Sequence, residues 1–183
     1  MLLSMVLSHS SNITLQEPGE KYSHERHKVL VSVEIVLFTI RNGVFEVLVL
    51  KRNSPPFLDF WELPGGLIRQ DIGQRGESAD DAALRELNRA TGLTGASLRY
   101  LEQLGTYGDP DRDPREERTI TIAYVGIGAN IAEPPEQSGA SFIPVSYVQD
   151  ELSNKLAFDH SAILSDAISK IRMGVEYSRL ASG

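Results

Sequence analysis

The sequence of 183 residues contains no cysteine, which excludes disulfide bonds and thiolate zinc sites. It also lacks an excess of basic residues: 18 Lys and Arg stand against 25 Asp and Glu, giving a formal net charge of −7. This balance argues against a protein that coats nucleic acid with a general basic surface. No stretch approaches the run of about 20 apolar residues that a membrane-spanning helix needs, so no membrane partner is expected.

The first 27 residues mix Ser, His, Asn, Glu and Pro without periodicity and predict a flexible N-terminal arm. Met1–Leu7 is apolar but short, and no basic residue precedes it, so a signal peptide is not expected. A bacterial cytoplasm or an equivalent compartment is therefore the expected location. His24 and His27 could bind a metal ion, but solvated histidines of an arm are the favoured interpretation.

The hydrophobic content of the whole sequence is 41%, and the rest of the chain predicts one globular domain over 28–174 and a short tail over 175–183. Asn42-Gly43 predicts a hairpin turn between two strands. The predicted strands are Val29–Ile40, Phe45–Lys51, Ala96–Leu104 and Phe142–Val148. A last helix is expected to begin after Asp159 and to stop at Gly174, so Asp159-His160 is interpreted as a helix start rather than as an acid–base pair.

The stretch Glu62–Leu93 predicts a glycine turn, a long loop and one capped helix. Ser78 can cap the helix start, with Asp81 in the place of the usual Glu or Gln of a capping box. A small apolar side for packing on a sheet is formed by Ala79, Ala82, Ala83 and Leu87. Thr91-Gly92 is expected to end the helix, because glycine readily takes the left-handed conformation at that position.

This stretch resembles the Nudix box: a Gly, five residues, a Glu, seven residues, then Arg-Glu-apolar-x-Glu-Glu-x-Gly-apolar. The matching residues are Gly66, Glu77, Arg85, Glu86, Leu87, Gly92 and Leu93. The resemblance implies an α/β Nudix fold, with a mixed β-sheet sandwiched between α-helices. It also implies kinship with hydrolases that split nucleoside diphosphates linked to another group.

Two departures from the box bear on the chemistry. In the family, glutamates at i, i+3 and i+4 of the helix carry magnesium, because these positions share one helix face. Here they are Glu86, Arg89 and Ala90, so the metal site is expected to be broken, with Glu86 as its remaining candidate ligand. Glu77, Arg85 and Glu86 are then remnants of a catalytic box. No cofactor is expected; Mg²⁺ or Mn²⁺ would be needed only by an active hydrolase.

The second departure is ten residues between Gly66 and Glu77, an insertion of five relative to the family spacing. Gly73 and Gly76 ease closure of this loop, and surface insertions cost little closure entropy. A tolerated surface insertion is favoured, and a loop that reshapes the mouth of the ligand site is the alternative.

Two further segments narrow the resemblance. YLEQLGTYGDPDRDPR followed by TITIAYVGI, and later PVSYVQDELSNKLAFDHSAILSDAISKIRM, are similar to one Nudix branch. That branch contains ADP-ribose pyrophosphatase-like proteins and the Nudix-related transcriptional regulators of NAD metabolism (NrtR), which sense ADP-ribose. The resemblance covers about residues 29–180. Those regulators continue into a winged-helix DNA-binding domain, whereas this chain ends at Gly183, so no nucleic-acid contact is expected through this chain alone.

Several residues are candidates for binding a polyphosphate ligand. Arginine side chains can pair bidentately with phosphate, and glycines let a backbone approach a ligand closely. Tyr107 could stack on a base or ribose. Arg89 is expected to supply the positive charge that magnesium would bring. The candidates are Arg52, Gly65, Gly66, Glu86, Arg89, Tyr107, Arg112, Arg115 and Arg118. The alternatives are a solvated strand end for Arg52, a self-paired charged loop over Tyr107–Arg118, and a simple surface pair between Arg89 and Glu86.

The sequence therefore predicts a protein that binds ADP-ribose or a related nucleoside diphosphate derivative as a sensor, with little or no hydrolysis. The first alternative is a Mg²⁺-dependent hydrolase that recruits Glu77, Glu86 and a loop carboxylate, Glu116 or Glu117. The second is a protein-interaction module with an empty cleft. A homodimer is left open.

Overall fold

The structure, a computed structural model, describes residues 5–6, 14–15, 28–70, 76–92 and 98–181. Within the N-terminal part, β1 (Met5–Val6) pairs antiparallel with β2 (Thr14–Leu15). Most of the predicted arm, including His24 and His27, lies outside the described residues.

A mixed sheet of seven strands is built around β3 (Val29–Arg41). β4 (Val44–Lys51) pairs antiparallel with β3 through a turn in which Asn42 and Gly43 have φ of 49° and 78°, which confirms the predicted hairpin. β8 (Arg118–Ala129) runs parallel to β3, and β7 (Tyr100–Tyr107) runs antiparallel to β8. The short strands are β5 (Trp61–Glu62) and β9 (Ala140–Pro144), on β4, and β6 (Gly65–Leu67), on β3.

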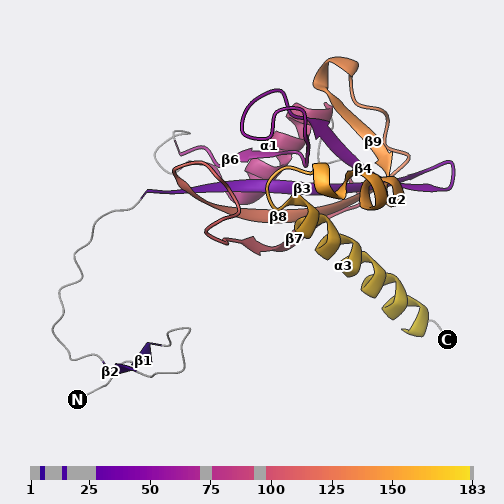
Figure 1. Cartoon of the computed structure of the whole chain (residues 1–183). Helices are drawn as coiled ribbons and strands as arrows, with labels where there is room; N and C mark the ends of the chain where they lie inside the picture. The colour runs from indigo at the N-terminus through magenta and orange to yellow at the C-terminus, as the bar shows by residue number, and fades with distance from the viewer. Residues whose placement is uncertain (1–4, 7–13, 16–27, 71–75, 93–97, 182–183) are drawn as a thin grey trace.

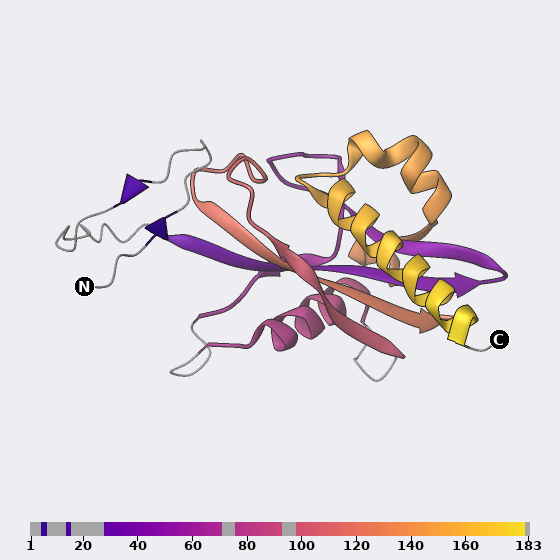
Figure 2. The same ribbon diagram turned by 90° about the horizontal axis from the view of Figure 1, so that it is seen from below.

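Both faces of this sheet are covered, and the alternation of side chains along β3 decides which residue faces which layer. Val33, Ile35 and Leu37 belong to one buried cluster, whereas Val36 and Phe38 belong to another. Figures 1 and 2 show α1 and α3 on opposite faces of the sheet. This is the mixed sheet between helices that the sequence predicted.

The first face is covered by α1 (Ala79–Thr91). Its start is capped as predicted: the Ser78 hydroxyl accepts a hydrogen bond from the backbone N–H of Asp81. Gly92 ends the helix with φ of 71°. Ala82, Ala83 and Leu87 are buried in the same cluster as Val33, Ile35 and Leu37 of β3.

The second face is covered by the C-terminal helices. They are α2 (Val145–Tyr147), η3 (Val148–Leu152), η4 (Ser153–Lys155) and α3 (His160–Ala181), and a separate short turn, η2 (Glu136–Ser138), precedes β9. Ile163, Leu164, Ala167 and Ile168 of α3 are buried with Val36 and Phe38. Trp61 lies partly buried against this cluster.

Three predicted element boundaries are wrong. The strand predicted over Ala96–Leu104 is β7, which begins at Tyr100 and continues to Tyr107. The strand predicted over Phe142–Val148 stops at Pro144, and the chain turns helical because Val145, Val148 and Leu152 are buried at helical spacing. α3 runs through Gly174 to Ala181, since one glycine costs only about 1 kcal/mol and does not stop a long helix. The predicted domain end at 174 therefore falls inside α3.

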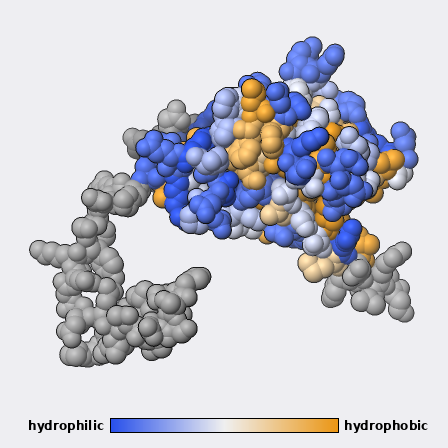
Figure 3. Space-filling view, viewed as in Figure 1, coloured by the Kyte–Doolittle hydropathy of each residue, from blue (hydrophilic) through white to orange (hydrophobic). Residues whose placement is uncertain are grey.

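The surface is mostly polar on the view of Figure 3, where hydrophilic residues cover most of the face and apolar residues form smaller patches between them. In the described part of the chain, no helix is long and apolar enough to cross a membrane.

Candidate functional site

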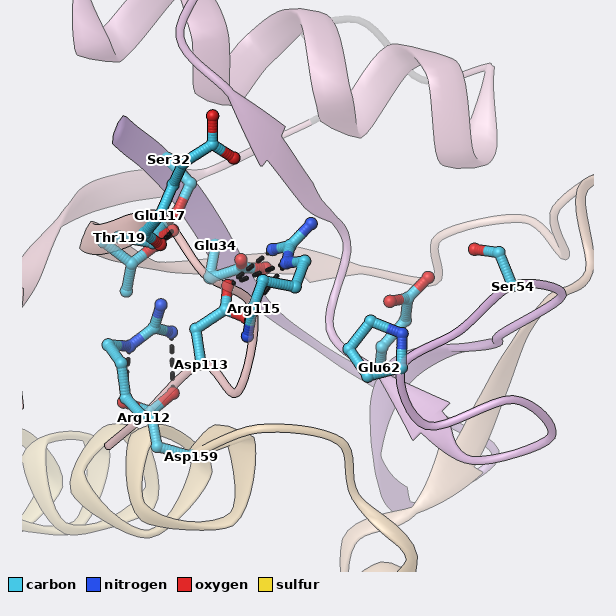
Figure 4. Close-up of polar contacts among 12 residues, drawn as sticks. Ser32, Glu34, Ser54, Glu62, Arg112, Asp113, Arg115, Glu117, Thr119 and Asp159 are labelled. Carbon is cyan, nitrogen blue, oxygen red and sulfur yellow. Dashed lines mark hydrogen bonds and ion pairs between the residues drawn. The ribbon is translucent and has the colours of Figure 1, made fainter. Parts of the chain in front are cut away.

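A charged hollow of about 140 Å³ opens where β3, β5 and β6 meet the loop between β7 and β8 and the start of α3. Its charged and polar lining residues are Ser32, Glu34, Arg52, Glu62, Arg112, Asp113, Arg115, Thr119 and His160. Gly65, Gly66 and Phe158 also line it, and Figure 4 shows many of these side chains together. Because the residues come from five separate segments, this site is assembled only by the fold.

Glu77 and Arg85, which keep the spacing of the box, tie the insertion loop to α1. Arg85 donates to both oxygens of Glu77, from Nε at 3.0 Å and from Nη2 at 2.5 Å, and Nη2 also donates to the Leu67 carbonyl at 3.0 Å. The Arg69 backbone N–H donates to Glu77 Oε1 at 2.7 Å. The hydrogen bonds from Arg85 lower the pKa of Glu77 from its ordinary value to about 2, although partial burial acts in the opposite direction. Of the loop itself, residues 71–75 lie outside the described part.

We expect Glu77→Ala to lower the free energy of unfolding by about 1 kcal/mol or more, because it removes charge-assisted hydrogen bonds that join loop and helix. Since the folded pKa of Glu77 lies below the unfolded value, this contribution is present above about pH 4.5 and is lost as the pH falls toward about 2. Urea unfolding of both proteins at neutral and acidic pH measures it. A stability difference that persists unchanged at acidic pH would contradict this role, and ligand affinity is expected to stay within a few-fold.

Glu86 is buried and its carboxylate is held by two guanidiniums. Arg85 donates to Oε1, and Arg89 Nε donates to Oε2 at 2.6 Å. A Cβ on Gly66 would lie 2.6 Å from Glu86 Oε1, so a larger residue here would have to displace the Glu86 carboxylate. Glu86 and Gly66 therefore form one close-packed unit at the edge of the hollow.

These residues do not fit a magnesium site. The position three residues after Glu86 is the cation Arg89, and the next, Ala90, is buried. Arg85 is bonded to both Glu77 and Glu86, so a guanidinium takes up these two carboxylates, and Glu117 pairs with Lys28 at 3.3 Å. Within residues 28–70, 76–92 and 98–181, no group of three or more His, Asp or Glu is placed to hold a metal ion. A cation of magnesium's size needs several oxygen ligands at once.

Arg89 lies between α1 and β6, with 58% of its side chain exposed. Besides its bond to Glu86, its Nη2 donates to the Gly65 carbonyl at 3.3 Å. The predicted pair with Glu86 is present, and the guanidinium also reaches the backbone that lines the hollow. Its contact with a ligand stays a prediction.

The other candidate arginines all have partners within the protein. Arg112, with 3% of its side chain exposed, donates to both carboxylate oxygens of Asp159 at 2.7 and 2.8 Å. Arg115 is half exposed and is bonded to Asp113, and Arg52 is bonded to Glu62 and to the Pro56 carbonyl. Arg52, Arg112 and Arg115 line the charged hollow, whereas Arg118 donates to the Gly108 carbonyl and lies elsewhere. Figure 4 shows the two loop pairs, Arg112–Asp159 and Arg115–Asp113.

A second, aromatic hollow of about 470 Å³ adjoins the first, and Arg112 and Phe158 line both. Its remaining lining residues are Phe57, Tyr107, Asp109, Asp111, Pro114, Asp159 and Ala162. The guanidiniums of Arg52 and Arg115 lie 4.9 and 5.4 Å from the Phe158 ring centre, and Phe57 packs edge-on against Phe158 at 5.0 Å. Phe158 thus lies where the two hollows meet, and the second hollow also contains the carboxylates of Asp109, Asp111 and Asp159.

Sequence reasoning missed Glu34, Phe158 and the side chain of His160 as lining residues. Glu34 could have been found, because it is a single carboxylate inside the apolar strand VSVEIVLF, where a charge is rarely tolerated without a purpose. His160 was noticed only as part of Asp159-His160 and was interpreted as a helix start, and Phe158 carried no comparable signal, since an aromatic residue before a helix is an ordinary core residue.

Three comparisons with known proteins bear on this site. Residues 30–166 match the family model described as NUDIX domain. The "ADPR responsive transcriptional repressor NtrR" of Acinetobacter baylyi is 27% identical over 82% of this chain, which spans 58% of that relative's length. The "ADP-ribose pyrophosphatase" of Methanocaldococcus jannaschii is 32% identical over 68% of this chain and 69% of its own.

Among solved structures, the NUDIX domain of Shewanella oneidensis NrtR complexed with ADP ribose is 29% identical, with a TM-score of 0.65 over 79% of this chain and 89% of that one. A structure of Shewanella oneidensis NrtR complexed with a 27mer DNA is also 29% identical, with a TM-score of 0.61 over 77% of this chain and 61% of that one. The similarity therefore spans nearly all the elements that line the two hollows.

Proposed function

The chain belongs to the Nudix family, as its sequence predicted, and on that premise we propose that it binds ADP-ribose or a related nucleoside diphosphate derivative. We further propose that it acts as a sensor and hydrolyses this ligand slowly or not at all. The two adjoining hollows are the observation that carries the proposal.

The two hollows have the chemistry of the two parts of a nucleoside diphosphate. Arg52, Arg112 and Arg115 line the charged hollow, and guanidiniums are the side chains best suited to phosphate oxygens. The aromatic hollow offers the rings of Phe57 and Tyr107, on which a base can stack. The Tyr107 hydroxyl is held by Asp166 at 2.7 Å, which orients the ring. A ligand with its diphosphate in the charged hollow and its base in the aromatic hollow would contact Arg112 and Phe158, which line both.

The paired state of the arginines decides how such a ligand would bind. Because Arg112 is buried and bonded bidentately to Asp159, it is expected to remain a structural support. Arg115 and Arg89 are at least half exposed and keep donors free for phosphate in this geometry. Both are therefore the better phosphate contacts.

Two features separate a sensor from the hydrolase alternative. The kinship with an ADP-ribose pyrophosphatase favours catalysis, whereas the replacement of two metal positions by Arg89 and Ala90 favours binding alone. The support for a regulatory role is the similarity to the NtrR repressor, and it rests on that relative's name. The absence of nucleic-acid contacts through this chain stays a prediction, because a relative of greater length has been solved with DNA. A homodimer stays open.

Calorimetric titration with ADP-ribose in EDTA tests the proposal directly. Saturable binding with one ligand per chain is expected, and AMP and ribose 5-phosphate, each carrying one half of the ligand, should bind more weakly. Complete absence of binding would contradict the proposal and favour the protein-interaction alternative.

Arg89→Ala is expected to weaken ADP-ribose binding in EDTA by about 1.5–3 kcal/mol, the range for a hydrogen bond to a charged group. The physical reason is that the guanidinium meets the diphosphate where the family places a metal ion. The same titration measures the loss, with Arg172→Ala, which removes an exposed arginine from α3, as the matched control. Parental affinity in Arg89→Ala would show that Arg89 only pairs with Glu86.

A further inference from the structure

Glu34 lies in the middle of β3 and its carboxylate faces the charged hollow, with 12% of the side chain exposed. It lies over the glycine turn: a Cβ on Gly65 would be 1.9 Å from Glu34 Oε2. Gly65 is also the residue whose carbonyl accepts from Arg89. Glu34 therefore stands beside the place where the proposed diphosphate would meet the Nudix box.

This carboxylate has no guanidinium partner among the described residues, although three arginines line the same hollow. Each of them is bonded to a different acid: Arg52 to Glu62, Arg112 to Asp159 and Arg115 to Asp113. The ionic contact found for Glu34 is His160 Nε2 at 3.7 Å, which is too long for a hydrogen bond.

A charged His160 could neutralise Glu34, but it would lose the hydrogen bond that holds its own ring in place. Its side chain is 1% exposed, and its Nδ1 accepts a hydrogen bond from the Leu63 backbone N–H at 3.0 Å. An accepting Nδ1 carries no hydrogen, so the imidazole hydrogen is on Nε2, which has no hydrogen-bond partner in the described residues. A charged imidazolium would need a hydrogen on Nδ1 as well and would lose the Leu63 bond. The Leu63 bond therefore does not favour a charged imidazole as the partner of Glu34.

The surroundings act on the pKa of Glu34 in both directions, and burial prevails. Burial is the largest influence and raises the pKa of Glu34 above its ordinary value, and Glu62 also raises it, whereas His160 and Arg112 lower it. The charged groups that face this region are Arg52, Glu62, Glu86, Arg89, Arg112, Asp113, Arg115 and His160. All the arginines among them are already bonded to carboxylates or carbonyls.

We propose that Glu34 is a proton-binding residue of the ligand site, so that an anionic diphosphate binds together with one proton. A charged Glu34 would repel the diphosphate, whereas a protonated Glu34 can donate a hydrogen bond to it. Binding then takes up a proton, and affinity falls as the pH rises, by at most about tenfold per pH unit for one proton. The affinity begins to fall near the raised pKa of Glu34 in the free protein and stops falling near the higher pKa of Glu34 in the complex. This inference rests on the proposed function.

Proton uptake is measured by titrating ADP-ribose in pairs of buffers with different ionisation enthalpies, from about pH 5 to about pH 9. The diphosphate of ADP-ribose does not titrate in this range, so uptake reports on the protein. The parent should take up as much as one proton per ligand. Glu34→Gln, which has the shape of the protonated acid, should bind without uptake and with nearly pH-independent affinity. Glu151→Gln, an exposed residue of η3, should behave as the parent.

The outcomes separate the two proposals. ADP-ribose binding without proton uptake in the parent would overturn the role of Glu34 and leave the proposed function standing. Persistent uptake in Glu34→Gln would overturn the assignment to this residue. No binding by the parent would overturn the proposed function itself. If Glu34→Gln does not fold, the titration of the Glu34 carboxyl signal in the NMR spectrum of the parent decides: the proposal requires it to move to higher pH when ADP-ribose is added.

Discussion

Incubated with ADP-ribose and Mg²⁺, the protein is expected to release product very slowly. Its turnover should be far below about one per second, a rate that is ordinary for an enzyme. The reason lies in the chemistry of the residues present. Metal catalysis requires an ion held rigidly by several oxygen ligands so that it can polarise a phosphoryl oxygen and activate water. Glu86 is the one carboxylate left of three, and Arg85 and Arg89 already occupy its oxygens.

Product formation followed by chromatography, with Mg²⁺, Mn²⁺ or EDTA, measures this directly. Turnover of the parent near one per second that disappears in EDTA would contradict the expectation and establish the hydrolase alternative. Arg89→Glu restores a carboxylate on an exposed part of α1 and should make ADP-ribose binding depend on Mg²⁺. Adding Ala90→Glu completes the three positions, although Ala90 is buried in the cluster under α1 and the charge will cost stability there.

Arg112→Ala is expected to lower the free energy of unfolding by about 3–5 kcal/mol, the range for breaking a buried ion pair by removing one partner. Arg112 is almost fully buried and holds both oxygens of Asp159, which directly precedes α3. Its loss leaves the Asp159 carboxylate without its guanidinium and releases the loop between β7 and β8 from the helix. Both hollows share Arg112, so ligand binding should weaken as well.

Urea unfolding measures this loss, with Arg118→Ala as the control. Arg118 is an exposed arginine that donates to the carbonyl of Gly108, near the same loop, and its removal should cost less than about 1 kcal/mol. Combining Arg112→Ala with Asp159→Ala should recover part of the stability, because no carboxylate is then left unpaired. If Arg112→Ala is no more destabilising than the control, the pair with Asp159 is not a structural support.

The sequence alone determined the features that depend on near neighbours in the chain. The hairpin at Asn42-Gly43 follows from residues that tolerate positive φ, and the caps of α1 follow from Ser78 and Gly92. The family could be inferred as well, because the Nudix box is one continuous stretch whose spacing is kept from Glu77 to Leu93. One boundary was wrong because burial overrode the local signal, where Val145, Val148 and Leu152 pack as helix rather than strand. Another was wrong at Gly174 because a single glycine does not stop a long helix.

Tertiary structure alone decided what the charged residues do. The sequence indicated Arg52 and Arg112 as phosphate contacts, but their partners were set by packing that brings the β7–β8 loop against α3 and β5 against the end of β4. The meeting of Glu34 on β3 with His160 at the start of α3 is likewise a product of that packing. Ion pairs and buried carboxylates of this kind join segments far apart in the chain, and no local pattern specifies which acid meets which base. The residue types were readable from the sequence, whereas their pairing, burial and proton affinity exist only in the folded chain.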